Sequence, residues 1–260
     1  MQPPGNIEDQ STIHHLFHFA YQMFRSDASD APRCTASRTA PTGSGESTPR
    51  HDNPWRAGRR QRAVKRALDI SLSATLLVLL SPLLLAIALS VAFSTGLPVI
   101  YQQRRIGREG RPFMFFKFRS MRHGANRALE QHLRSNPVAR TEWNAFQNLT
   151  ADPRVTPTGR ILRRLSLDEL PQLWNVLKGD MSLVGPRPCM ERQVSLHATG
   201  WAHYCALRPG MTGLWQVSGR NSLTYRQRVE LDIEYVDRWS VSLDLVILAK
   251  TIRAVLAGGG

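Results

Sequence analysis

Acidic residues and cysteines are both scarce in this chain. It has 20 Asp and Glu against 34 Lys and Arg, which gives a formal net charge of +14 over 260 residues. The three cysteines, Cys34, Cys189 and Cys205, lack the spacing of a metal site, and so odd and sparse a set argues against a disulfide framework. There is no internal repeat. These shortages leave a basic protein whose expected partners are anionic: nucleic acid, an anionic membrane surface or phosphorylated substrates.

Long apolar runs are also rare, and the one exception points to a membrane. Ala67–Phe93 has 27 residues, a single charge at Asp69 and a break at Ser81-Pro82. Six basic residues precede the run and six follow it: Arg56, Arg59, Arg60, Arg62, Lys65 and Arg66, then Arg104, Arg105, Arg108, Arg111, Lys117 and Arg119. Because basic flanks favour the cytoplasmic side, a hairpin that enters the membrane and returns would keep both clusters on one face. The alternative is an ordinary spanning helix with a proline kink.

Ser81 and Pro82 mark the expected break between two helical arms, 67–80 and 82–93. Pro82 has no N–H and its ring clashes with the carbonyl four residues earlier, so a helix must bend there. The Ser81 hydroxyl can satisfy a carbonyl that the bend leaves unpaired. Each arm is about 20 Å long, which suffices to enter one leaflet but not to cross the bilayer alone. Asp69 is spaced to pair with Lys65 or Arg66 on one helix face.

Composition divides the chain into three parts. Residues 1–60 are rich in Ser, Thr, Pro, Arg, Asp and Gly, and we expect a disordered tail. We predict that residues 61–96 form a re-entrant membrane hairpin and that residues 97–260 form a small cytoplasmic domain. Within the tail, the stretch 12–24 is richer in aromatic residues and contains His14, His15 and His18. These histidines lack the accompanying ligands of a metal site, so partial order in this stretch is the preferred interpretation. The predicted fold class is α+β and mainly helical, with amphipathic interfacial helices after the hairpin.

Apolar spacing and turn residues give a coarse map of the cytoplasmic domain. Residues 97–118 are predicted to form two extended segments around a turn at 107–112, with arginines that face lipid headgroups. Helices are predicted at 158–165, 167–177, 222–238 and 244–256, a polar helical lid at 125–145, and a proline-flanked loop at 182–188.

The densest group of charged side chains lies at residues 163–173. Asp168 and Glu169 are predicted to start a helix just after Arg163 and Arg164. One interpretation is structural: Ser166 caps the helix and Glu169 completes a capping box. That interpretation leaves Asp168 and the arginines unexplained. A helix start also attracts anions, so these residues could hold a divalent cation and a phosphate, with one carboxylate attacking phosphorus and the other binding the metal.

Two further segments carry candidate phosphate ligands. Arg187, between two prolines, could bind a phosphate in a bidentate way, although such a turn is more often structural. Residues 208–221 contain glycines that let backbone approach a ligand, and the segment ends near Arg220. This segment is neither GxGxxG nor a P-loop with its lysine. Asp232 follows as a supporting or metal-facing acid, and Asp244 could equally be a helix cap.

These motifs occur in a specific order. They are KRALDI, the LSP break, IGREGRPFMFFKFRSM, LRRLSLDELPQLWNVLKGDMSLVGPRP, RPGMTGLWQVSGRN and LDIEYVDRWSVSLDL. The series resembles the bacterial sugar transferase family of monotopic phosphoglycosyl transferases, which includes the initiating enzymes of exopolysaccharide synthesis. The resemblance runs from about Lys65 to Ala257. The first 60 residues match nothing known in the family, so the chain looks like its short form, without an additional N-terminal membrane domain.

The resemblance implies a reaction and its partners. Such enzymes transfer a sugar phosphate from a UDP-sugar to undecaprenyl or another polyprenyl phosphate, with magnesium, and release UMP. This would be the first membrane step of exopolysaccharide or other glycan biosynthesis. It would take place at the bacterial inner membrane, with 97–260 as the catalytic domain on the cytoplasmic face. Inner-leaflet anionic lipids are further expected partners, nucleic acid is not, and homo-oligomerisation is left open.

The resemblance also implies roles for single residues. Asp168 matches the nucleophile that becomes phosphoglycosylated, and Glu169 matches the magnesium ligand. Arg163 and Arg220 match phosphate-binding arginines, and Asp232 matches an acid near the site. Ser81 and Pro82 match the re-entrant break.

Two other classes of function compete with this interpretation. A non-catalytic, membrane-anchored binder of anionic polymers would explain the charge and the anchor, but it needs no Asp-Glu pair. A glycosidase with two carboxylates is weaker still, because adjacent residues do not naturally face each other across a sugar ring.

Overall fold

The protein, seen here as a computed structural model, is described over residues 58–197 and 200–256. The predictions for Arg56, for the three tail histidines and for residues 1–57 in general lie outside this part. Within it the chain is mainly helical, with two small sheets of two strands each, which confirms the α+β class.

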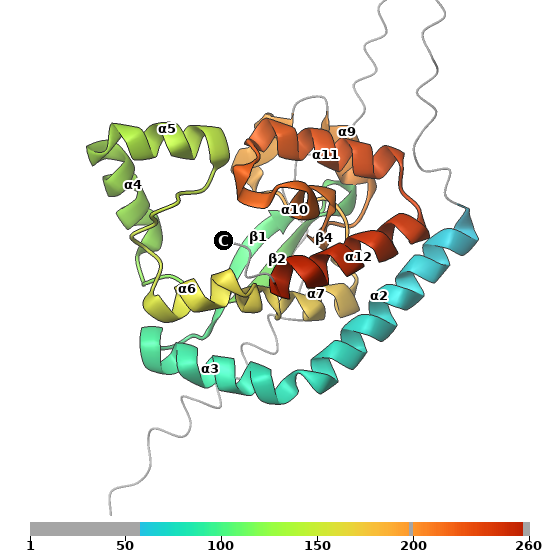
Figure 1. Cartoon of the computed structure of the whole chain (residues 1–260), viewed down its shortest axis with the longest axis horizontal. Helices are drawn as coiled ribbons and strands as arrows, with labels where there is room; N and C mark the ends of the chain where they lie inside the picture. Colours follow the sequence, from blue (N-terminus) through green and yellow to red (C-terminus); the bar gives the residue numbers. More distant parts are fainter. Residues whose placement is uncertain (1–57, 198–199, 257–260) are drawn as a thin grey trace, which may run out of the picture.

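The apolar run forms two helices with a sharp break. Helix α2 (Arg59–Leu79) and helix α3 (Ser81–Thr95) are bent by 64°, and they extend along the lower edge of the molecule in Figure 1. The Ser81 hydroxyl donates a hydrogen bond to the Val78 carbonyl at 2.8 Å, as the sequence predicted. In the described part no single helix is long and apolar enough to cross a membrane, whereas α2 and α3 together meet that requirement as a broken span or a re-entrant loop.

Helix α2 is held to the rest of the chain by buried polar contacts. The spacing of Asp69 suggested an ion pair with Lys65 or Arg66, but neither pair forms in the described part of the chain. The Asp69 Oδ1 accepts hydrogen bonds from the Ser182 hydroxyl at 3.1 Å and the Leu183 N–H at 3.0 Å. Lys65 instead forms an ion pair of 2.6 Å with Asp244. The charged face of α2 therefore points into the domain, because each group finds a buried partner there.

A β-hairpin follows α3. Strand β1 (Ile100–Ile106) pairs antiparallel with β2 (Pro112–Phe118), and a short 3-10 turn, η1 (Arg108–Gly110), lies between them. This confirms the predicted extended segments. The prediction that the hairpin arginines face lipid headgroups is wrong for Arg105, which is buried and donates to the Pro188 carbonyl at 2.9 Å.

Helices and 3-10 turns make up most of the remainder. They are α4 (Ala125–Ser135), α5 (Pro137–Phe146), α6 (Pro157–Arg164), η2 (Leu167–Glu169), α7 (Gln172–Lys178), η3 (Glu191–Gln193), α8 (Val194–His197), α9 (Trp201–Ala206), α10 (Leu214–Ser218), η5 (Arg220–Ser222), α11 (Tyr225–Asp237) and α12 (Val241–Leu256). The predicted lid is helical but divides at Pro137, and α4 and α5 stand apart from the other elements in Figure 1. The predicted helix 167–177 is wrong as a single element, because Pro171 separates η2 from α7.

The second sheet was not foreseen. Strand β3 (Ser182–Val184), inside the segment predicted as a loop, pairs in parallel with β4 (Gly210–Thr212), for which no strand was predicted. The two backbones approach so closely that a Cβ on Gly210 would lie 2.1 Å from the Gly185 nitrogen. The glycine at 210 therefore serves contact between two protein backbones, whereas the sequence had suggested approach to a ligand.

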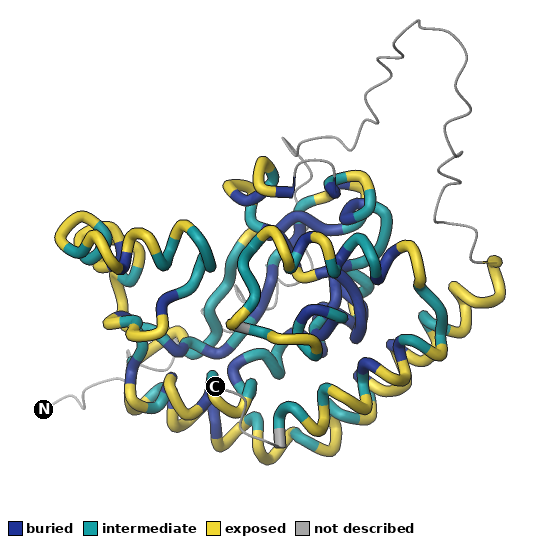
Figure 2. Tube along the Cα trace, turned by 45° about the horizontal axis from the view of Figure 1, so that its top comes forward, coloured by how far each residue is buried: buried dark blue, intermediate teal, exposed yellow. Residues whose placement is uncertain are grey.

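The main core lies between α2, β2, α7, α11 and α12. Its buried members are Phe113, Phe115, Leu173, Val176, Met181, Leu183, Val184, Tyr235, Val236 and Ile247. Leu76 and Leu77 of α2 pack against this core. The outer side of α2 and α3 is exposed along its length in Figure 2, and Val78 and Phe93 are 74% and 90% exposed. An apolar surface of this extent is typical of a membrane or protein interface.

Candidate active site

The adjacent carboxylates Asp168 and Glu169 lie in η2, between α6 and α7. Ser166, just before the turn, has φ 56° and ψ 20°, in the left-handed region that non-glycine residues rarely adopt. Its side chain makes no capping hydrogen bond within the described residues, so the predicted capping box is wrong. Helix capping, the purely structural explanation for Glu169, therefore does not account for the two carboxylates.

The two carboxylates differ in their surroundings. Asp168 is buried, with 6% of its surface exposed, whereas the Glu169 side chain is 28% exposed. Burial raises the pKa of Asp168, and the neighbouring charge of Glu169 raises it further; the charges of Lys117 and Arg163 oppose both. The pair therefore has one poorly solvated carboxylate that two cations support, and one that keeps access to solvent.

Lys117, on β2, contributes a cation from a different part of the chain. Burial and the nearby charge of Arg163 lower the pKa of Lys117 to about 8, while Asp168 and Glu169 counteract the shift. Its ammonium group lies 5.6 Å from the centre of the Tyr101 ring, on the paired strand β1. At neutral pH the ammonium group is charged, so a bound phosphate could interact with it in addition to Asp168 and Glu169.

Arg163 is held in place by the docking of α6. Its Nε donates to the Ser120 hydroxyl at 3.0 Å. Helix α6 approaches the same residue so closely that a Cβ on Gly159 would lie 2.0 Å from the Ser120 carbonyl oxygen. Burial lowers the pKa of Arg163, and Asp168 is the main group that opposes this. The guanidinium is thus fixed beside Asp168 by its own hydrogen bond.

Arg187 approaches the carboxylates from the loop after β3. Its Nη2 lies 3.7 Å from Glu169 Oε1, and its side chain is 45% exposed. Its guanidinium carbon is 5.4 Å from the centre of the Trp215 ring, on α10, and Arg228 lies at 4.8 Å from the same ring. Because nearly half of its side chain is exposed to solvent, Arg187 can reorient toward a ligand that binds next to Glu169.

The other two predicted residues, Asp232 and Arg220, come from later elements, α11 and η5. Asp232, on α11, is buried, and its Oδ1 has no hydrogen-bond partner in the described part of the chain. Burial raises its pKa, and a backbone hydrogen bond with Arg187 and the charge of that arginine oppose the shift. Arg220, with φ 49°, donates through Nε to the Gln216 carbonyl at 3.1 Å. Asp232 thus lies next to the Arg187 loop, whereas the hydrogen bond of Arg220 is to α10.

Comparison with known proteins decides the family. Residues 60–258 match the family described as bacterial sugar transferase. The chain belongs to the bacterial sugar transferase family. Since it is an enzyme family, this membership favours catalysis over the alternative of a non-catalytic binder of anionic polymers.

Curated relatives of this sugar transferase have related names. The exopolysaccharide production protein ExoY of Rhizobium meliloti is 48% identical over 196 residues, which cover 75% of this chain and 87% of the relative. The undecaprenyl-phosphate galactose phosphotransferase of Salmonella typhimurium is 46% identical over 204 residues, 78% of this chain. The chain covers only 43% of that longer relative.

One side chain of this sugar transferase, the Glu169 carboxylate, is suited to bind magnesium. Among residues 58–197 and 200–256, no group of three or more His, Cys, Asp or Glu side chains could hold a metal ion by itself. Magnesium commonly binds to one or two carboxylates and takes its other ligands from substrate phosphates and water. Glu169, with its partly exposed carboxylate next to Asp168, fits that pattern.

Lys117 is the residue that sequence reasoning missed in this sugar transferase. It was counted only as one of the basic residues that flank the apolar run. The signal was available, however, because both faces of this strand carry phenylalanines: Phe113 and Phe115 on the face of Lys117, Phe116 and Phe118 on the other. A lysine in a strand that is apolar on both faces needs a nearby anion or a function.

Proposed function

We propose that this sugar transferase moves a sugar 1-phosphate from a UDP-sugar to polyprenyl phosphate and releases UMP. The activity class, a phosphoglycosyl transferase, follows from the family and from relatives named for undecaprenyl-phosphate sugar transfer. The observation that best supports the residue roles is the turn at 167–169, where a buried carboxylate lies among the charges of Lys117 and Arg163.

The proposed chemistry has two displacement steps at the phosphorus that carries the sugar. An oxygen of Asp168 attacks this phosphorus, an O–P bond forms, and the diphosphate P–O bond breaks to release UMP. A phosphate oxygen of polyprenyl phosphate then attacks the same phosphorus, and the Asp168 carboxylate leaves. The acyl phosphate divides one difficult transfer into two easier ones. Asp168 suits the role of nucleophile better than Glu169, because its carboxylate is the less solvated of the two.

The surrounding cations have separate tasks in this proposal. Lys117 and Arg163 hold the donor phosphates beside Asp168 and stabilise the charge that develops on the moving phosphoryl oxygens. Arg187 and Arg220 bind the outer phosphate oxygens, and Asp232 keeps the Arg187 loop in position. A magnesium ion at Glu169 would neutralise further negative charge on the diphosphate.

We also propose that the enzyme works at the cytoplasmic face of the bacterial inner membrane. The exposed apolar side of α2 and α3, together with the break at Ser81, suits insertion into one leaflet. Polyprenyl phosphate has its headgroup at the same depth, so the anchor limits the search for the acceptor to the membrane surface.

The replacement Asp168→Asn tests the proposed nucleophile. The amide keeps the size of the side chain but cannot attack phosphorus, so we expect UMP release to fall by at least about a thousandfold. Incubation with donor alone should load the wild-type protein with one sugar phosphate, detectable by intact-protein mass spectrometry, and should not load the variant. Both proteins should still fractionate with membranes. Asp180→Asn, another acid near α7 that pairs with Lys178 at 3.4 Å, is the matched control.

Two results would contradict this assignment. Release of UMP by Asp168→Asn at the wild-type rate would exclude Asp168 as the nucleophile. A sugar phosphate located by peptide mapping on Glu169 would reverse the two roles. A panel of UDP-sugars in the same assay would identify the donor.

A further inference from the structure

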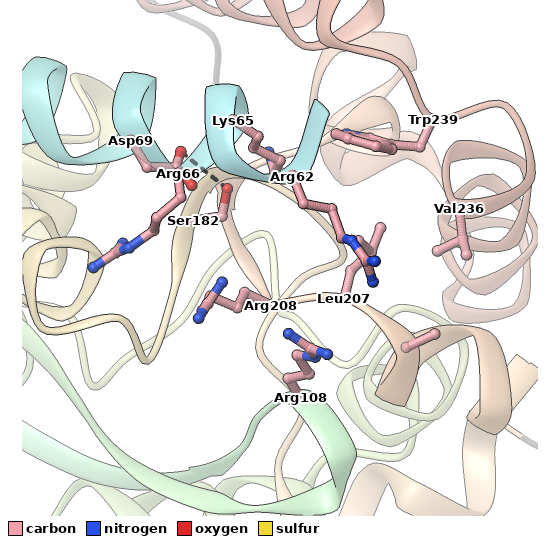
Figure 3. Close-up of a pocket in the computed structure, with 11 residues that line it drawn as sticks. Arg62, Lys65, Arg66, Asp69, Arg108, Ser182, Leu207, Arg208, Val236 and Trp239 are labelled. Carbon is pink, nitrogen blue, oxygen red and sulfur yellow. Dashed lines mark hydrogen bonds between the residues drawn. The ribbon is translucent and has the colours of Figure 1, made fainter. Parts of the chain in front are cut away.

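A cavity beside the C-terminal end of α7 collects basic side chains that the proposed reaction does not use. It is lined by Arg62, Lys65, Arg66, Asp69, Arg108, Ser182, Ala206, Leu207, Arg208, Val236 and Trp239, and its volume including the mouth is about 610 Å³. The five cations come from the start of α2, from η1 and from the segment before β4, and Figure 3 shows them around one space. None of these lining residues belongs to the group around Asp168.

The acids near the cavity do not balance its cations. Lys65 is paired with Asp244 at 2.6 Å, and Arg108 Nη2 lies 3.2 Å from Glu109. The Asp69 carboxylate accepts hydrogen bonds from Ser182 and Leu183, as described above. Counted against these three acids, the five cations leave a surplus of two positive charges among the described residues.

Two of the arginines are held by neutral oxygens. Arg66 donates to the Val176 and Leu177 carbonyls at 2.7 and 2.8 Å, at the end of α7. Arg208 donates through Nε to the Gly179 carbonyl at 2.7 Å. These bonds fix both guanidinium groups without neutralising them. Each guanidinium has five N–H donors, so several remain for a ligand on each side chain.

The guanidinium groups also repel one another across the cavity. Burial lowers the pKa of Arg208, and the charges of Arg66 and Arg108 lower it further, against the opposing charges of Asp69 and Glu109. An anion between these side chains would relieve the repulsion and gain charge-assisted hydrogen bonds.

The cavity also has apolar lining residues. Leu207, Val236 and Trp239 lie on the side toward which Arg62 extends in Figure 3, so a ligand with an organic group beside its anionic group would contact both kinds of side chain. From this arrangement we infer that the cavity is a second anion site, which takes a phosphate ester and is separate from the site at Asp168. The chemistry is shared by two sources, a phospholipid headgroup and a soluble phosphate ester. The lipid source rests on the proposed membrane insertion of α2, which would place the cavity at headgroup depth.

The test uses the full chain and measures binding, so its result does not depend on turnover. The protein is incorporated into phosphatidylcholine vesicles with and without phosphatidylglycerol, extracted into mild detergent, and examined by native mass spectrometry for retained phosphatidylglycerol. In parallel, glycerol 3-phosphate is titrated against the detergent-solubilised protein and the unfolding temperature is followed. Retained lipid alone identifies the headgroup as the ligand, and a thermal shift alone identifies the soluble ester.

Matched variants separate a built site from diffuse attraction. Arg208→Gln should weaken binding of the effective probe about tenfold, the loss expected for one charge-assisted hydrogen bond. Arg62→Gln should weaken binding about threefold, since this side chain is exposed. Arg60→Gln, on the same helix but outside the cavity lining, removes the same charge and should leave binding unchanged.

Either of two results would overturn the inference. One is that neither phosphatidylglycerol nor glycerol 3-phosphate binds to the wild-type protein. The other is that Arg60→Gln weakens binding as much as Arg62→Gln, which would show general attraction to the basic end of α2. Because Arg208 also holds the Gly179 carbonyl, its variant could unfold; the comparison of Arg62 with Arg60 then decides, since neither forms an ion pair within the described residues.

Discussion

Lys117 makes the rate of the proposed transfer depend on pH in a way that can be measured. Burial and Arg163 lower its pKa to about 8, so in the free enzyme about nine tenths of the ammonium is charged at pH 7 and about one tenth at pH 9. If the charge holds the donor phosphates, kcat/KM should fall as the pH rises through 8, approaching about tenfold for each further pH unit. UMP release at low donor concentration measures this directly.

The stability of the protein should change in the opposite direction over the same range. The pKa of Lys117 is lower in the folded protein, about 8, than the ordinary value of 10.5 for an unfolded chain. Between these values the unfolded chain binds more protons, so the free energy of unfolding rises with pH, by at most about 3 kcal/mol for this one group. Loss of activity above pH 8 without a lower unfolding temperature would therefore indicate deprotonation and not denaturation.

Substitution at the same position provides the control. In Lys117→Arg the guanidinium stays charged throughout this range, so whatever activity it keeps should lack the decline near pH 8. Lys178→Arg, which changes an exposed lysine on α7, should behave like the wild type. The same decline near pH 8 in wild type and Lys117→Arg would refute the assignment of the titration to Lys117.

Two further predictions concern stability. Ser166→Gly should raise the unfolding temperature by about 2 to 4 °C, because glycine adopts the left-handed conformation at φ 56° without the cost of roughly 1 kcal/mol that serine incurs. Ser166→Ala should give no such gain, and a lower unfolding temperature for the glycine variant would contradict the argument from strain. Asp69→Ala should destabilise the protein by about 2 to 5 kcal/mol in denaturant titrations, because the buried Leu183 N–H and Ser182 hydroxyl lose their acceptor. The amide oxygen of Asp69→Asn still accepts these hydrogen bonds, so this variant should lose less than half as much unfolding free energy. Equal losses in the two variants would show that the hydrogen bonds do not account for the destabilisation.

Local signals in the sequence predicted the elements that depend on neighbouring residues. The break at Pro82 follows from the chemistry of proline, and the turn between β1 and β2 follows from residues 107–112. The strands β3 and β4 could not be predicted in this way. Each has three residues and acquires its partner 28 positions away along the chain, in the pairing of Ser182 with Gly210. Nothing within either segment specifies the other.

The same distinction applies to the candidate site. Asp168, Glu169 and Arg163 were found because they lie within one short segment, where their types and spacing are visible together. Lys117 comes from β2, about fifty residues earlier, and only tertiary packing brings its charge to Asp168. The wrong prediction of one helix at 167–177 had a local cause: apolar spacing was given more weight than Pro171.

The inward-facing side of α2 has a practical consequence for handling the protein. Lys65 neutralises Asp244, Asp69 satisfies backbone at Leu183, and Leu76 covers the main core. A shortened chain that started at β1 would leave a buried carboxylate without its cation and expose the core to water, so trimming the helical pair would yield a misfolded or aggregating product. Amphiphiles that shield the outer side of α2 and α3 are the better route to a homogeneous sample.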